Sequence, residues 1–103
     1  MIFISSCAYE KIEKPAPESN ILQANKKYRI NLPEDHTTGY TWQLSDGYDK
    51  TIIENTSAIF HGNTNGVDFN FLTHARGTTT LTFISRKYTD TSEIKQFVVQ
   101  INE

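Results

Sequence analysis

Apolar side chains recur at every second position through most of the chain, and this period restricts the fold more than any other feature. Tyr28, Ile30 and Leu32, for example, alternate with Arg29 and Asn31. The alternating segments are 28–32, 40–44, 67–71, 79–83 and 97–101. A side-chain period of two is that of a β-strand with one face in a core and the other in water. The sequence therefore predicts at least five half-buried strands.

Several short strands separated by polar turns predict an all-β sandwich. The composition agrees, because 13 threonines and 11 isoleucines among 103 residues favour strands over helices. No segment carries a sustained apolar stripe of helical period. The segment 51–60 is less regular, and we expect it to contain a bend between two short strands.

The net charge and the residue types present exclude several classes of protein. A net charge of −2 leaves no electrostatic footprint for nucleic acid. One cysteine cannot form an internal disulfide bond, and three scattered histidines are poor material for a metal site. A nucleophile paired with a base is also missing, because Cys7 has no evident histidine partner and His36, His61 and His74 read as solvated loop residues. We expect no enzyme activity, no cofactor and no bound metal.

The first residues resemble a lipoprotein signal. Ile4-Ser5-Ser6-Cys7 is similar to a bacterial lipobox, in which the cysteine is lipidated and begins the mature chain. The basic region and the longer apolar region that normally precede such a cysteine are missing. The sequence predicts lipidation at Cys7, and a free buried thiol on an N-terminal strand is the alternative.

The segment 8–20 alternates charged residues around Pro-Ala-Pro, which is typical of a semi-extended tether. We therefore expect residues 1–20 to be a signal remnant with a flexible tether, and residues 21–103 to be the folded domain. Such a protein would be anchored in the cell envelope or periplasm, with Cys7 its sole membrane attachment, or else secreted.

The connections between strands fall into two groups. If each strand runs antiparallel to the one before, alternate connections share an end of the sandwich. One end then carries 33–39, 61–66 and 86–92, and the other carries 45–50 and 73–77.

The first group resembles a binding end, because its threonine, asparagine, glycine, tyrosine and arginine residues are those of antibody loops. An ordinary turn with Asx and glycine chemistry is the alternative for 33–39. The predicted binding residues are Asp35, His36, Thr37, Thr38, Gly39, Tyr40, Gly62, Asn63, Thr64, Asn65, Gly66, Arg86, Lys87 and Tyr88.

The segment His36-Thr37-Thr38-Gly39-Tyr40-Thr41-Trp42 resembles the Asn-Pro-Thr-Thr-Gly-Tyr/Phe-x-Trp signature of the chagasin family. These proteins inhibit papain-like cysteine peptidases. The glycine-rich second motif of the family has its counterpart in 62–66, and Arg86-Lys87-Tyr88 stands where the family has Arg-Pro-Trp. The resemblance covers residues 22–102.

This resemblance implies an immunoglobulin-like antiparallel β-sandwich, monomeric, whose three loops enter a peptidase cleft reversibly and without covalent chemistry. The first loop would lie over the catalytic Cys-His pair, and Trp42 would pack beneath it. Asp35-His36 replaces Asn-Pro, and the loss of proline predicts a looser first loop. The second functional class is a non-inhibitory β-sandwich module for adhesion or interaction at the cell surface.

Overall fold

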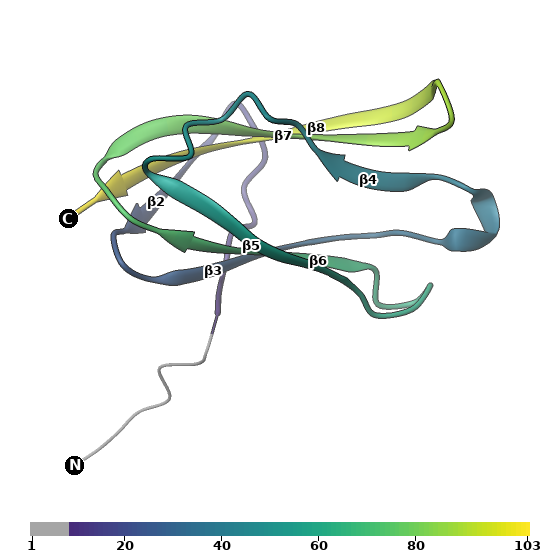
Figure 1. Cartoon of the computed structure of the whole chain (residues 1–103), viewed down its shortest axis with the longest axis horizontal. Helices are drawn as coiled ribbons and strands as arrows, with labels where there is room; N and C mark the ends of the chain where they lie inside the picture. The colour runs from purple at the N-terminus through teal and green to yellow at the C-terminus, as the bar shows by residue number, and fades with distance from the viewer. Residues whose placement is uncertain (1–8) are drawn as a thin grey trace, which may run out of the picture.

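Two four-stranded sheets lie face to face in a computed structural model, which describes residues 9–103 (Figure 1). The first sheet contains, in spatial order, β1 (Glu10–Lys11), β3 (Lys27–Leu32), β6 (Val67–Thr73) and β5 (Ile53–Phe60). The second contains β2 (Ser19–Gln23), β8 (Asp90–Asn102), β7 (Gly77–Lys87) and β4 (Thr41–Leu44). A short 3₁₀ turn, His36–Thr38, precedes β4. Within the described residues, no helix has the length and apolar character to cross a membrane.

Most of the alternating apolar residues form the core between the sheets, as the sequence predicts. The prediction of a half-buried strand is wrong for β6, because Asp68 and Asn70 on its other face are also buried. Tyr28, Ile30 and Leu32 of β3 are all buried, while Lys27 and Asn31 between and beside them are exposed. Aromatic rings from both sheets meet at the centre. The ring of Phe83 packs edge-on against Phe69 at 4.8 Å and against Phe97 at 5.8 Å between centroids. Offset and edge-on contacts of this kind join the two layers.

The predicted grouping of the connections is confirmed. Leu32 pairs with Val67 at the end of β3, and Thr41 pairs with Arg86 at the start of β4. Three connections therefore lie together at the right-hand end of Figure 1: 33–40, 61–66 and the tip of the β7–β8 hairpin. The other two meet at the opposite end, where the His74 backbone N–H donates to the Ile52 carbonyl at 2.8 Å.

Two strand boundaries differ from the prediction. The third connection is a two-residue turn, because β7 continues through Lys87 and β8 begins at Asp90. The apolar alternation stops after Phe83 because the next inward-facing residue, Ser85, is buried but polar, and the residues from Arg86 to the turn are exposed. The segment 51–60 holds one strand, with a bulge between Asn55 and Ser57, and not two short strands with a bend.

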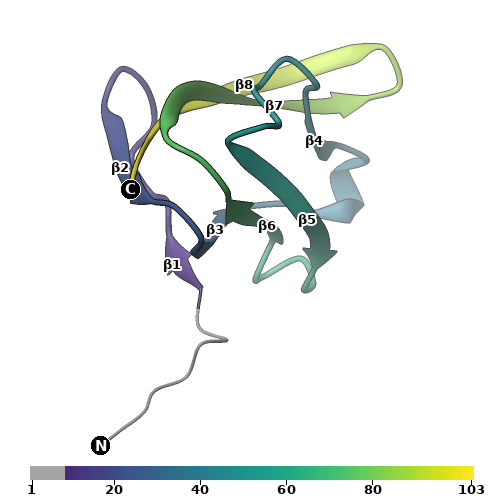
Figure 2. The ribbon, with the colours of Figure 1, turned by 60° about the vertical axis from the view of Figure 1, so that its left-hand side comes forward.

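The expected tether is wrong for residues 9–20, which pack onto the sandwich. β1 pairs in parallel with β3, and β2 pairs in parallel with β8 beside the C-terminus (Figure 2). Ile12 is 3% exposed and belongs to the core, and the Asn20 side chain bonds both the N–H and the carbonyl of Lys14. The expected domain boundary at residue 20 therefore falls inside β2. Cys7 lies outside the described residues, so its lipidation stays a prediction.

Replacing Ile12 with alanine should lower the free energy of unfolding by about 2–4 kcal/mol, because a buried isoleucine leaves a cavity. Urea denaturation of the full chain measures the loss. The control is Ile21→Ala in β2, where the side chain is 60% exposed; its effect should stay within about 0.5 kcal/mol. Equal midpoints for Ile12→Ala and wild type would mean that the N-terminal segment contributes nothing to the core.

Candidate functional site

Side-chain hydrogen bonds join the three connections at the right-hand end of Figure 1. The His36 backbone N–H donates to Asn63 Oδ1 at 3.0 Å, which links the first connection to the second. The Tyr40 hydroxyl donates to Asp90 Oδ2 at 2.7 Å, which links the first to the hairpin. The predicted binding residues are thus brought to one end of the sandwich from three separate parts of the chain.

The first connection is ordered by its own short polar side chains. Asp35 Oδ1 accepts from the Thr37 backbone N–H at 2.9 Å and from Thr37 Oγ1 at 2.7 Å, as an N-cap does. Thr38 Oγ1 donates to the Asp35 carbonyl at 2.8 Å and accepts from the Tyr40 N–H at 3.2 Å. Gly39 ends the turn at φ +83°, a conformation that favours glycine. Thr37 and Thr38 are left exposed at the tip.

The bonds from Thr37 hold the pKa of the Asp35 carboxyl below its usual value of 3.8, since they favour the charged form. A carboxylate whose pKa is lowered by folding contributes its full stabilisation above the unperturbed pKa of 3.8 and loses it as the pH falls through the lowered pKa. The turn should therefore stay capped across the mildly acidic range. We expect the amide proton of Thr37 to titrate by NMR with a midpoint below 3.8. A midpoint at or above that value would show that the cap does not form in solution.

Glu34 is a buried carboxylate beneath this turn, and it is not among the residues predicted from the sequence. Glu34 is 8% exposed, and its Oε1 accepts a hydrogen bond from the Trp42 backbone N–H at 2.7 Å. Its Oε2 lies 2.7 Å from His36 Nε2. Trp42 is itself buried and donates its indole N–H to the Pro33 carbonyl at 2.7 Å, so it packs under the loop as expected. A lone glutamate after a proline carries no pattern that would have identified this role.

The structure does not support a loosely held first loop. The ring of His36 stacks on Phe60 of β5 with centroids 3.7 Å apart and planes 12° from parallel. The same ring contacts Glu34, and the backbone N–H of His36 is bonded to Asn63. His36, which stands where the family has proline, is thus fixed by contacts with Phe60, Glu34 and Asn63.

The second connection depends on two glycines with positive φ. Gly62 has φ +103° and Gly66 has φ +74°, and the Gly66 N–H donates to the Gly62 carbonyl at 2.9 Å. Asn31 of β3 donates to the Asn65 carbonyl at 3.0 Å and so fixes the connection to the sheet. Asn63, Thr64 and Asn65 remain exposed.

The hairpin tip presents an aromatic ring. Tyr88 occupies the turn with φ +56° and is 92% exposed, the highest exposure among the large apolar side chains described. Lys87 lies along the first connection, because a Cβ placed on Gly39 would lie 3.1 Å from Lys87 Cε. Arg86 is exposed beside it. This end of the molecule therefore combines an ordered turn, a glycine-rich loop and a projecting tyrosine.

A family model described as "Chagasin family peptidase inhibitor I42" matches residues 21–101. The chain belongs to the chagasin family. All three connections of the site lie inside the matched segment, so the resemblance seen in the sequence is confirmed. A search of curated proteins found no match.

A solved structure has the same fold as this chagasin-family chain. It is the crystal structure of the cysteine protease inhibitor EhICP2 from Entamoeba histolytica, with a TM-score of 0.72 and 15% sequence identity. The match covers 91% of this chain and 93% of that chain. The predicted immunoglobulin-like sandwich is confirmed.

The three histidines of this chagasin-family chain are exposed, as the sequence predicts, and each of them also contacts a carboxylate. His61 Nε2 lies 2.9 Å from Asp68 Oδ2, and His74 Nε2 lies 2.8 Å from Glu54 Oε1. Asp68 is 7 residues from His61 in the sequence and Glu54 is 20 residues from His74, so a local sequence pattern does not reveal these two contacts. Between residues 9 and 103, no group of three or more His, Cys, Asp or Glu side chains could hold a metal ion.

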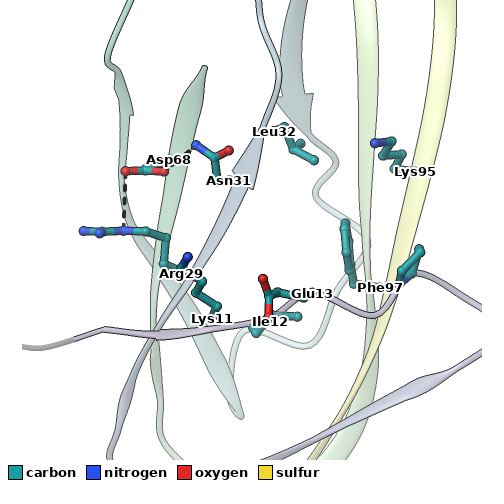
Figure 3. A pocket seen from close by; sticks show the side chains of 10 residues that line it. Lys11, Ile12, Glu13, Arg29, Asn31, Leu32, Asp68, Lys95 and Phe97 are labelled. Atoms are coloured by element: carbon teal, nitrogen blue, oxygen red, sulfur yellow. Dashed lines mark hydrogen bonds and ion pairs between the residues drawn. The ribbon is translucent and has the colours of Figure 1, made fainter. Parts of the chain in front are cut away.

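The largest hollow described lies away from the three connections. It has a volume of about 520 Å³ and lies between β3, β8 and the N-terminal segment (Figure 3). The Asp68 carboxylate on its wall is occupied, because it contacts Arg29 Nε at 3.5 Å and accepts from Asn31 Nδ2 at 2.8 Å. None of the predicted binding residues lines this hollow. A smaller hollow of about 250 Å³ lies within the candidate site itself, and its lining includes Asp35, Thr38, Tyr40 and Asn63. The candidate site therefore consists of the exposed turn tip and the hollow beside it.

Proposed function

We propose that this chagasin-family chain inhibits papain-like cysteine peptidases reversibly and without covalent chemistry, by inserting the end formed by 33–40, 61–66 and 86–90 into the active-site cleft. One observation carries the proposal. Thr37 and Thr38 stand exposed on a turn that is already ordered, with the other two segments bonded on either side. A site of this shape fits over a catalytic Cys-His pair at the floor of a groove.

The ordered turn favours binding and resists cleavage. Its side chains form their hydrogen bonds in the free chain, so less conformational entropy is lost on binding. Threonine is β-branched and has few rotamers to lose. A 3₁₀ turn ended by Gly39 is also unlike the extended peptide that a peptidase cleaves. Tyr88 and Arg86 are of the residue types that contribute most at interfaces.

The remaining assignments are part of the same proposal. The protein is an inhibitor and not an enzyme, it acts as a monomer, and a lipid on Cys7 anchors it as a bacterial lipoprotein in the cell envelope. The lipobox-like Ile4-Ser5-Ser6-Cys7 supports the anchor. Mass spectrometry of protein extracted from membranes tests it, since an unmodified Cys7 in a soluble fraction would exclude the anchor.

Titration of the full chain against papain and a cathepsin L-like peptidase tests the inhibition. We expect reversible inhibition at submicromolar concentration, because a three-segment interface can reach the roughly 800 Å² per partner of standard inhibitor complexes. The full chain is required, since a chain beginning at residue 20 would lose Ile12 from the core. No inhibition of either peptidase at micromolar concentration would favour the cell-surface interaction module instead.

A further inference from the structure

We propose that Glu34 and His36 are positioning residues for peptidase binding: through contacts within the chain they hold Thr37–Gly39 in its binding conformation. This inference rests on the proposed function, and it changes the role of His36, which the sequence placed among the contact residues.

Glu34 connects the turn to the core. A buried carboxylate is costly unless its oxygens are satisfied, and here both oxygens have partners. One accepts from the Trp42 backbone N–H and the other faces His36 Nε2, each at 2.7 Å. Trp42 is a buried residue of β4. The position of the His36 ring is therefore fixed relative to the second sheet.

Phe60 and Asn63 fix His36 from the other side. The His36 ring lies flat on Phe60 at 3.7 Å, and Phe60 is the last residue of β5 in the first sheet. The His36 N–H donates to Asn63 Oδ1 in the second connection. His36 thus joins both sheets and two of the three binding segments. One ring face thus lies on Phe60 and Nε2 lies against Glu34, while 46% of the His36 side chain stays exposed.

The position of His36 in turn fixes the backbone that carries Thr37 and Thr38. It is the first residue of the 3₁₀ turn, and its carbonyl accepts the N–H of Gly39 at 3.2 Å. The Thr38 N–H donates to the Asp35 carbonyl at 3.1 Å, immediately before His36. Without the ring contacts, the turn would keep its local bonds and the backbone bond from His36 to Asn63, but it would lose its links to Glu34 and Phe60. A turn that must be ordered during binding costs affinity.

His36→Ala in the full chain should raise the inhibition constant for papain by about tenfold. The matched control is His74→Ala, which removes another histidine–carboxylate contact of 2.8 Å at the opposite end. That control should leave the inhibition constant unchanged. Glu34→Gln keeps an acceptor for the Trp42 N–H and a polar partner for His36, so its inhibition constant should stay within about threefold of wild type. His36→Phe keeps a flat ring on Phe60 but leaves the buried Glu34 Oε2 without its partner, so it should recover only part of the affinity that His36→Ala loses.

Amide hydrogen exchange of the free chain gives a readout that needs no peptidase. His36→Ala should speed exchange at Thr38 and Gly39 by about tenfold, while His74→Ala should not. If His36→Ala and His74→Ala change inhibition and exchange equally, or neither changes them, the positioning role is wrong. A wild-type chain that inhibits nothing would refute the proposed function, and the exchange rates would still decide whether Glu34 and His36 order the turn.

Discussion

Gly66→Ala is expected to lower the free energy of unfolding by about 3 kcal/mol, since two separate costs add at this position. Gly66 has φ +74°, which strains any residue with a Cβ. A Cβ at this position would also lie 2.2 Å from the Leu32 carbonyl oxygen, and backbone cannot move aside as a flexible side chain does. Leu32, the last residue of β3, pairs with Val67, the first of β6, so the clash should separate these strands where the second connection ends.

Gly62→Ala is the control for this prediction. Gly62 also has positive φ, at +103°, but a Cβ there meets nothing within 4 Å. Its cost should be the backbone strain alone, about 1 kcal/mol. Urea denaturation of both variants separates the two contributions. Equal losses for the two would mean that the close approach of Gly66 to Leu32 does not exist in solution.

The strands of the sandwich could be predicted from apolar–polar alternation wherever one face of the strand is buried and the other is exposed to solvent. The sequence predicts β3, for example, because its apolar residues Tyr28, Ile30 and Leu32 alternate with polar neighbours. The same reasoning stops at Phe83, since the next inward-facing residue, Ser85, is buried but polar, and Arg86 and Lys87 beyond it are exposed. The length of β7 is set by cross-strand pairing with β8, which a local pattern does not contain.

The N-terminal segment was missed for a related reason. Its core contribution is a single residue, Ile12, among charged neighbours and two prolines, and one apolar residue has no period. β2 is an edge strand that pairs in parallel with β8 across 79 positions of sequence, from Ser19 to Val98. Composition alone gives such a segment the appearance of a linker.

The end of the sandwich that carries the candidate site could be predicted from the sequence, but the residues that fix its loops could not. Alternation of strand direction was enough to gather 33–39, 61–66 and the hairpin tip. The anchors beneath them, Glu34 and Asp68, are buried polar residues whose partners come from other elements. Their roles depend on tertiary distances, and so neither stands out in the sequence. Both anchors fix an exposed loop to buried or paired strands, which is how a polar loop end can remain rigid.

Thr37→Arg should raise the inhibition constant for papain by on the order of 100-fold with little change in stability. Thr37 is exposed at the tip of the first connection, so a longer side chain finds room in the free chain. In the complex the same side chain would occupy the space that the turn needs to approach the catalytic residues. The backbone N–H bond from residue 37 to Asp35 is retained, so the turn itself should persist.

The chain offers a closely matched control at its opposite end. Asp49 Oδ1 accepts from the Thr51 N–H at 2.9 Å and from Thr51 Oγ1 at 2.6 Å, which repeats the Asp35–Thr37 arrangement. Thr51→Arg therefore loses the same hydroxyl bond and adds the same charge, away from the proposed interface. It should leave the inhibition constant unchanged, and the two variants should have equal melting temperatures. Equal inhibition by both variants would remove the first connection from the mechanism, because charge and local structure change alike in each and only their position on the sandwich differs.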